Sequence, residues 1–392
     1  MTDAPVRQGS LREHNLGLVL RQVASAGRPP SRADIAAATS LTRATVSALV
    51  DDLIEGGLLT EVDPAPRAGA GRPAAGLVLS AAGPAGLGLE INVDYLSACV
   101  VDLAGSVRHQ EVRHADQRPR DPAQVWAEVA ELAASARARV EQEGLLLAGA
   151  AVAVPGLVTA DGLVRLAPNL GWRDVAVPSS LAGVAVTVDN EANLAALSEL
   201  HASASASQHS FLYVSGEIGI GAGIVLNGAL FRGARGWSGE LGHVAVHPDG
   251  PTCRCGAHGC LEQYAGQEAI LRAAGAASLD DLRSRAEAGD PAAGEALAAA
   301  GTALGVTIAG VINLLDVEAV VLGGAYAPLA RWLHPGVAGE IGQRVLTAAW
   351  SPVPVRPSLL GGDAAVVGAA GSVVRAIRDH PARWLAASTR HG

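Results

Sequence analysis

One histidine and three cysteines lie close together in the segment GELGHVAVHPDGPTCRCGAHGCLEQ: His243, Cys253, Cys255 and Cys260. One imidazole and three thiolates complete the tetrahedral set of a structural zinc ion, and they leave no position open for a catalytic water. Gly256 and Gly259 allow the chain to turn closely around an ion. His247 and His258 are spare candidate ligands. We therefore predict a structural Zn2+ site, and the alternative is a loop of reduced cysteines without metal.

A second group of polar side chains has the chemistry to bind a sugar. Carboxylates and amides suit a pyranose because each presents two polar atoms in one plane to adjacent hydroxyls. Such side chains stand at turn positions near glycines: Asn169, Asn190, Glu191, Glu240, His243 and Glu262. They could instead be surface or capping groups, and Asp189 or Asn190 could cap the helix that follows. Their convergence beside a Gly-rich cleft favours a binding site.

Three helical patterns and a hairpin precede these groups. Apolar residues recur at helical spacing over 16–23, and Ser31 begins a second helix with a capping-box pattern. Thr42 can cap a third helix, which Gly56 ends. Two short strands then flank a tip rich in Pro, Gly and Arg. This order is typical of a winged helix-turn-helix, and the alternative is a three-helix protein-interaction module.

Beyond a boundary near 81–84 the pattern alternates strands and helices. Residues 86–105 indicate a strand, a tight turn and a second strand, and residues 210–233 repeat that unit with a Gly-bearing turn. Two such units about 125 residues apart indicate a duplicated α/β fold with a cleft between its halves. Residues 265–312 are predicted to be Ala-rich helix, and a final helix follows the Gly361-Gly362 turn.

Composition bounds the location of the chain. The apolar share is 49% and aromatic residues make up only 3%, so Ala, Val and Leu must fill the core. We expect no membrane span, since no apolar run is expected to approach ~18 uncharged residues. The first residues lack the apolar core of a signal peptide, so a cytoplasmic location follows by default. Cys99 lies in an apolar stretch and is expected to be buried.

The net charge of −9 does not favour nucleic-acid binding through bulk charge. The charged residues are unevenly distributed along the chain, however. Residues 1–80 hold eight Arg and eight Asp or Glu, so this part is neutral and the remainder carries the whole negative charge. A neutral N-terminal segment followed by an acidic remainder is compatible with DNA binding through one local face of that segment.

The motif Glu240-x-Gly242-His243, followed by Cys253-x-Cys255-Gly256-x-x-Gly259-Cys260-x-Glu262, resembles the signature of the ROK family of repressors and sugar kinases. The likeness covers nearly the whole chain and is of the xylose-repressor or N-acetylglucosamine-repressor type. It implies an α/β fold: an N-terminal winged helix-turn-helix followed by an actin-like (sugar-kinase, ribonuclease H-like) two-lobed domain. It also implies that the six polar residues are sugar contacts, with His243 binding zinc through one ring nitrogen and sugar through the other.

The phosphate-binding turns depart from the pattern of the ROK kinases. Where those kinases carry an Asp-x-Gly-Gly-Thr type of turn, this chain has Glu90-Ile-Asn-Val-Asp94, whose side chains occupy the space of phosphate oxygens. The Asp94 carboxylate at ~4 Å from a phosphate would cost about 4 kcal/mol at an effective dielectric constant of ~20. Ile218 replaces a Thr in the second turn, and Glu191 stands at the base position instead of Asp. We therefore expect no kinase activity.

The resemblance also assigns the N-terminal segment to operator binding. In such folds the third helix enters the major groove with its first residues against the base edges. The residues that we expect to contact DNA lie at that end, with one more in the wing: Thr42, Arg43, Thr45, Ser47 and Arg72. Arg43 is the best candidate for a guanine or phosphate contact, and Arg72 suits insertion into a narrow minor groove.

Together these observations predict a sugar-responsive transcriptional repressor. We expect a winged helix-turn-helix over 1–80, a first lobe over 84–190 plus about 370–392, and a second lobe with the zinc loop over 191–369. The expected partners are double-stranded operator DNA, a sugar effector and further copies of the chain in a homodimer or homotetramer. One alternative is an ATP-dependent sugar kinase with a regulatory N-terminal extension, and another is a sugar-binding scaffold whose front end binds protein.

Overall fold

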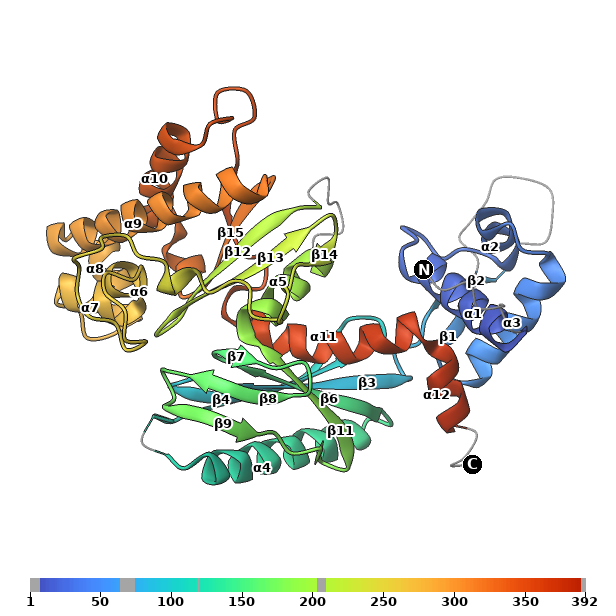
Figure 1. The fold of residues 1–392 in the computed structure, drawn as a ribbon. Coiled ribbons are helices and arrows are strands. Elements are labelled where there is room, and N and C mark those ends of the chain that lie inside the picture. The colour runs from blue at the N-terminus through green and yellow to red at the C-terminus, as the bar shows by residue number, and fades with distance from the viewer. Residues whose placement is uncertain (1–7, 64–74, 119, 203–208, 389–392) are drawn as a thin grey trace.

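The computed structural model describes residues 8–63, 75–118, 120–202 and 209–388, and Figure 1 shows a small N-terminal head beside two larger lobes. The head consists of α1 (Gln8–Ala24), α2 (Arg32–Thr39), α3 (Arg43–Glu55), β1 (Leu59–Val62) and β2 (Gly76–Leu79). Ser31 caps α2 in a capping box with Asp34, and the Thr42 hydroxyl accepts from the Thr45 amide at 3.1 Å to cap α3. The expected winged helix-turn-helix is thus confirmed. Its wing tip, which includes Arg72, lies outside the described residues.

The first lobe is built on a six-stranded sheet in the order β10-β11-β6-β3-β4-β5. Its strands are β3 (Pro84–Ile91), β4 (Tyr95–Asp102), β5 (Val107–His114), β6 (Leu146–Val154), β10 (Ser180–Leu181) and β11 (Val184–Asn190). Helix α4 (Pro122–Glu141) covers one face and α11 (Ala364–Asp379) covers the other, so β3 is buried along its whole length. A small sheet of β7 (Leu157–Val158), β8 (Leu163–Ala167) and β9 (Trp172–Ala176) lies beside it.

The second lobe is built on a five-stranded sheet in the order β14-β13-β12-β15-β16. Its strands are β12 (Phe211–Gly216), β13 (Ile220–Leu226), β14 (Ala229–Leu230), β15 (Ala319–Gly324) and β16 (Val355–Pro357). The helices α6 (Glu262–Ala265), α7 (Gln267–Ala274), α8 (Leu279–Glu287), α9 (Pro291–Leu315) and α10 (Tyr326–Arg344) pack against it. Helix α5 (Glu191–Ala202) lies between the lobes and packs against α11.

The two sheets repeat one topology, as the sequence repeat predicts. In each sheet a hairpin comes first, β3 with β4 and β12 with β13, and two parallel strands follow on the same side. Those strands are β6 and β11 in the first lobe and β15 and β16 in the second. Since parallel strands present their carboxyl ends at one edge, each lobe directs its strand-end turns toward the space between them.

The Ala-rich stretch 265–312 is mostly helical, as predicted, but it is divided into separate helices because Gly266 and Gly275 end two of them. One expectation about the second lobe was wrong. Helix α9 contradicts the expectation about apolar runs, since residues 296–315 contain no charged side chain. By length and composition alone this helix of 25 residues could cross a membrane, but 56% of its most apolar window is buried inside the protein.

Candidate functional site

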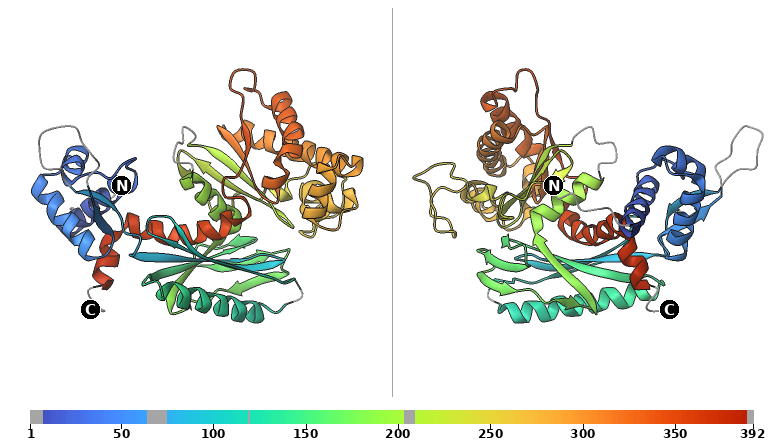
Figure 2. Two further views of the ribbon diagram at one scale, coloured as in Figure 1. Left: turned by 180° about the vertical axis from the view of Figure 1, so that it is seen from behind. Right: turned by 45° about the vertical axis from the view of Figure 1, so that its right-hand side comes forward.

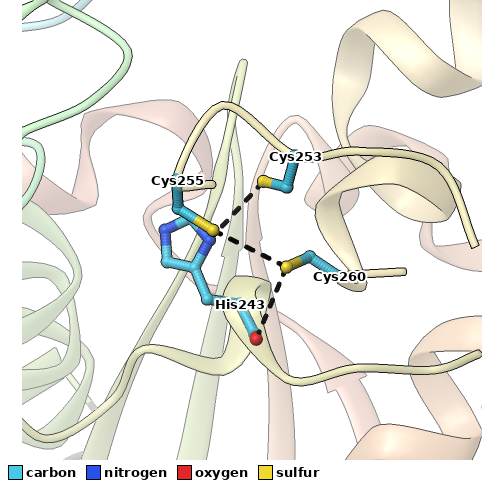
Figure 3. Close-up of side chains that lie close together, drawn as sticks. All are labelled: His243, Cys253, Cys255 and Cys260. Carbon is cyan, nitrogen blue, oxygen red and sulfur yellow. Dashed lines mark hydrogen bonds between the residues drawn. The ribbon is translucent and has the colours of Figure 1, made fainter. Parts of the chain in front are cut away.

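The four predicted metal ligands converge in the loop between η1 (Leu241–His243) and α6, as Figure 3 shows. The ligand atoms of His243, Cys253, Cys255 and Cys260 all lie within 4.8 Å of one another. The Cys255 and Cys260 Sγ atoms are 3.8 Å apart, and the Cys253 Sγ lies 3.8 Å from His243 Nδ1. Bonds of ~2.3 Å in a tetrahedron place two sulfur ligands ~3.8 Å apart. This spacing therefore fits a tetrahedral ion, and the cluster could hold a metal.

Electrostatics in the loop also favours a cation. In the protein without metal, burial and, to a lesser extent, the neighbouring Cys255 and Cys253 thiols raise the pKa of the Cys260 thiol to about 12. A divalent ion removes this cost because it binds the thiolate form. Backbone bonds hold the loop, with Cys253 N–H donating to Ala257 O at 2.8 Å. The two spare histidines are not in the cluster: His247 packs against the Tyr264 ring, and His258 lies 3.4 Å from the Thr252 hydroxyl.

The six predicted sugar contacts line one cavity of about 470 Å³ between the lobes. Its polar groups are Asn169, Asn190, Glu191, Glu240, His243 and Glu262, and the rest of its wall is proline, glycine and Ile220. Asn169 and Asn190 lie on first-lobe turns, whereas Glu240 and Glu262 flank the metal loop. The sequence therefore located one pocket, and the role of each side chain in it stays a prediction.

The metal cluster and the cavity share His243. Its Nδ1 faces the Cys253 Sγ, while its Nε2 lies 4.0 Å from a Glu240 oxygen. A Glu262 oxygen lies 4.0 Å from Nδ1, and its other oxygen lies 3.5 Å from the Asn169 amide. A ligating histidine is commonly oriented by carboxylates beside the ring. A metal on Nδ1 would therefore fix the imidazole and place its second nitrogen among the groups of the cavity.

Asn190 and Glu191 differ in how many of their side-chain polar atoms already make hydrogen bonds within the protein. The Asn190 Oδ1 accepts from the Ala192 and Asn193 amides at 2.9 and 3.2 Å, and its Nδ2 donates to Gly156 O at 3.0 Å. It therefore caps α5, which was the alternative to a sugar contact. The buried Glu191 Oε2 has no hydrogen-bond partner among the described residues. Glu191 thus has an acceptor available for a ligand.

Carboxyl groups gather beside the predicted sugar contacts, and sequence reasoning missed one of them. Glu90, Glu191 and Glu217 line a second, smaller cavity, which shares Glu191 with the first. The Tyr95 hydroxyl donates to Glu90 at 2.8 Å. The Asn92 Oδ1 accepts from the Val93 amide at 2.6 Å, so the Asn92 side chain is hydrogen-bonded within the turn between β3 and β4. A Glu within the apolar run VSGEIG was the available signal for Glu217.

Ile218 is the residue where the second phosphate turn differs most. It comes from the second lobe, yet it is buried in the hydrophobic cluster of the first lobe together with Leu89, Ile91 and Val93. The side chain therefore joins the lobes through apolar contact at the position where ROK kinases carry a hydroxyl. A phosphate group would meet an apolar side chain at this turn.

These buried carboxylates predict a pH dependence of stability. Burial raises the pKa of Glu90 to about 7 and that of Glu191 to about 8, above the ordinary value of 4.5. The folded protein then binds more protons than the unfolded chain between pH about 4.5 and 8, so the free energy of unfolding falls as pH rises through this window. Urea unfolding from pH 5 to pH 8 measures it. Glu90→Gln should flatten the profile and Glu295→Gln, on an exposed turn of α9, should not; equal slopes in both would contradict the assignment.

The predicted DNA contacts lie at the exposed start of α3. Arg43 is the first residue of the helix, and it makes no hydrogen bond or ion pair within the described residues. Two of the three acidic residues farther along the helix are paired, since Asp51 contacts Arg32 at 2.7 Å and Asp52 contacts Arg12. The Thr42 and Thr45 hydroxyls bond to each other at 2.8 Å, and Ser47 is half-buried. The end of α3 with a free cation is therefore the end that a major groove would meet.

Comparison with known proteins agrees with both parts of this architecture. The sequence profile of the ROK family matches residues 86–375, and that of the MarR family matches residues 17–69. The chain is 29% identical to the xylose repressor of Bacillus subtilis (strain 168) over 374 residues, which are 94% of this chain and 96% of the relative.

Solved structures with the same fold include regulators and kinases. One is a ROK family transcriptional regulator, a homolog of the Escherichia coli Mlc protein, with a TM-score of 0.79 at 26% identity over 97% of this chain and 100% of that chain. Another is a ROK family glucokinase from Streptomyces griseus in complex with glucose and AMPPNP, with a TM-score of 0.64 at 25% identity over 74% of this chain and 98% of that chain. Since the family profile matches well over half of its residues, the chain belongs to the ROK family.

Proposed function

We propose that the protein is a sugar-responsive transcriptional repressor without kinase activity. The observation that carries this proposal is the combination of a winged helix-turn-helix with a hydroxyl-binding cavity whose phosphate side is filled by carboxylates. The likeness to a xylose repressor over nearly the whole of both chains supports it. The cytoplasmic location, the homo-oligomeric state and the domain boundaries expected from the sequence stay predictions.

Zinc is the metal that we propose for the cluster. Three thiolates and one imidazole at tetrahedral spacing suit zinc, and a closed set of four protein ligands gives it a structural role. His243, Cys253, Cys255 and Cys260 would hold it. Bound there, it supplies a fixed position for the imidazole and for the turn that carries Glu262.

The sugar would bind between groups from the two lobes. Asn169 and Asn190 approach from the first lobe, and Glu240 with Glu262 approach from the metal side of the second. A ligand that bridges them stabilises the closed arrangement more than the open one. A difference of ~1–3 kcal/mol would change operator affinity roughly 5–150-fold, and we propose that it weakens binding, so that the sugar is an inducer.

Operator binding in the presence of sugars tests the proposal. The full chain is titrated against duplex DNA from its own upstream region, alone and with a panel that includes xylose, glucose and N-acetylglucosamine. We expect one sugar to weaken binding at least 5-fold, with a steep salt dependence from released counterions. Unchanged operator affinity with every sugar that the protein binds would overturn the proposal.

A coupled phosphorylation assay separates the regulator from a sugar kinase. Glu191 stands at the base position of the ROK kinases, so the rival activity has a candidate residue. We expect no turnover with ATP and any sugar of the panel, because Glu90 and Glu217 occupy the phosphate side and would repel ATP when ionised. Turnover that Glu191→Ala abolishes would favour the kinase instead.

Removal of the Arg43 side chain is expected to weaken operator binding. A contact from this residue to a guanine or a phosphate is worth ~1–3 kcal/mol, so Arg43→Ala should lower the affinity roughly 5–150-fold and leave sugar affinity unchanged. Fluorescence anisotropy with the operator duplex measures the change. Arg331→Ala removes an equally exposed charge from α10 and serves as the control. An equal loss in both variants would mean that bulk charge, rather than this contact, binds DNA.

A further inference from the structure

We propose that α11 and α12 (Pro381–Ser388) form the element that couples the sugar cavity to the DNA-binding head, with Trp384 as the residue that positions α3. This inference rests on the proposed function. Figure 2 shows in two views that α11 extends from the space between the lobes to the head, where α12 meets it. Helix α11 has 16 residues and is therefore about 24 Å long, at the rise of ~1.5 Å per residue of an α-helix. A single helix thus connects the space between the lobes to the head.

One end of α11 lies at the second cavity, which shares Glu191 with the cavity of the predicted sugar contacts. Ala364 and Ala365 line the cavity that also contains Glu90 and Glu191. The Ser198 hydroxyl of α5 donates to Ala364 O at 2.8 Å. Since Glu191 is the first residue of α5, a ligand that draws on this residue acts on a helix in direct contact with α11.

The contacts along α11 leave little room for sliding. A Cβ atom at Gly368 would lie 2.0 Å from the Leu194 carbonyl oxygen of α5, and one at Gly88 of β3 would lie 2.1 Å from the Val366 carbonyl oxygen. No side chain separates the two backbones at these glycines, and even a methyl group would not fit between them. A displacement of α5 is therefore transmitted to α11 as a movement of the whole helix.

The other end of α11 belongs to the core of the head. Val374 and Ile377 are buried in the same hydrophobic cluster as Leu16 and Val46 of the head. The apolar interior of the head therefore does not close on itself but continues into the first lobe. A movement of α11 therefore displaces side chains in the same hydrophobic cluster as residues of α1 and α3.

Helix α12 contacts the C-terminal end of α3. The Trp384 indole N–H donates to Gly56 O at 3.0 Å, and Gly56 is the residue that caps α3. A Cβ atom at Gly56 would lie 2.0 Å from a Leu385 methyl carbon. On the opposite side, a Cβ atom at Gly83 would lie 2.2 Å from the Gly57 carbonyl oxygen, so the connection into β3 holds the same turn. The orientation of α3 is thus set where two elements of the first lobe meet its end.

The test is the ratio of operator dissociation constants with and without the inducing sugar. Trp384→Phe removes the indole hydrogen bond and keeps an aromatic ring, and Trp384→Ala removes both. We expect sugar affinity of the free protein to stay within about twofold and the ratio to fall at least threefold toward one in Trp384→Ala, with a smaller fall in Trp384→Phe. Arg383→Ala, an exposed neighbour on α12, should keep the wild-type ratio.

The outcomes separate this inference from the proposed function. A wild-type ratio of one would end the proposed function and this inference with it. A wild-type ratio above one that both Trp384 variants retain would overturn the inference alone. If Trp384→Ala unfolds the head in thermal melts, the Trp384→Phe ratio decides, and an unchanged ratio in that variant counts against the coupling.

Discussion

Cys260→Ser is expected to remove the metal and sugar binding together, and to leave operator binding in the absence of sugar intact. Cys260 is fully buried, and Glu262 of the cavity begins α6 two residues later. Without the fourth ligand the tetrahedral set is incomplete. The two remaining thiolates and the imidazole then lose the positive charge of the metal ion that stabilises them. We expect the bound zinc to fall from one ion per chain to a small fraction, and sugar affinity to fall at least 100-fold.

Elemental analysis and calorimetric titration with the inducing sugar measure these two losses. Cys99→Ala is the matched control, because Cys99 is also buried but lies on β4, away from the cluster. It should retain one zinc ion and its sugar affinity. Full zinc occupancy in Cys260→Ser, or unchanged sugar affinity after the zinc is lost, would contradict the role given to the loop.

Glu191→Ala is expected to cause a loss of sugar affinity without loss of metal. The unpartnered Oε2 can accept from one sugar hydroxyl and the second oxygen from another. Burial raises the pKa of Glu191 to about 8, so at pH 7 the group is largely neutral and its hydrogen bonds are worth about 0.5–1.5 kcal/mol each. Two of them correspond to a loss of roughly 5–150-fold. Glu191→Gln keeps one acceptor and should lose less.

The control for this change is Glu217→Gln, which alters a half-buried carboxyl group that lines the second cavity and not the first. Its sugar affinity should stay within a few-fold of wild type. Isothermal titration at pH 7 compares the three variants, with zinc content measured in each. A Glu191→Ala protein that binds sugar as wild type does would show that Glu191 supports the fold rather than the ligand.

The sequence predicted what local spacing encodes. The four metal ligands lie within a short segment, and Ser31 and Thr42 mark the starts of α2 and α3 by side-chain capping, so these features follow from neighbouring residues. The duplicated sheets were also predictable, because each strand pattern repeats along the chain.

What the sequence did not predict depends on contacts between distant segments. Nothing near Trp384 indicates that its indole meets Gly56, which lies 328 positions away in the sequence. The position of Glu217 in one cavity with Glu90 depends on how the two lobes meet, and the second hydrogen bond of Asn190 depends on the position of the Gly156 carbonyl. The prediction of Ala-rich helix over 265–312 did not place the breaks between the helices, because alanine favours helix at every position and does not mark where glycine interrupts it.

The insertion of Ile218 into the opposite lobe limits how far the two halves can separate. Withdrawing this buried side chain into water would cost about 1.5–3 kcal/mol. That penalty equals the whole coupling of ~1–3 kcal/mol that a typical effector supplies. The unliganded protein should therefore sample only narrow openings, with Ile218 as a pivot, and small-angle scattering should detect a change in the head rather than a wide gap between the lobes.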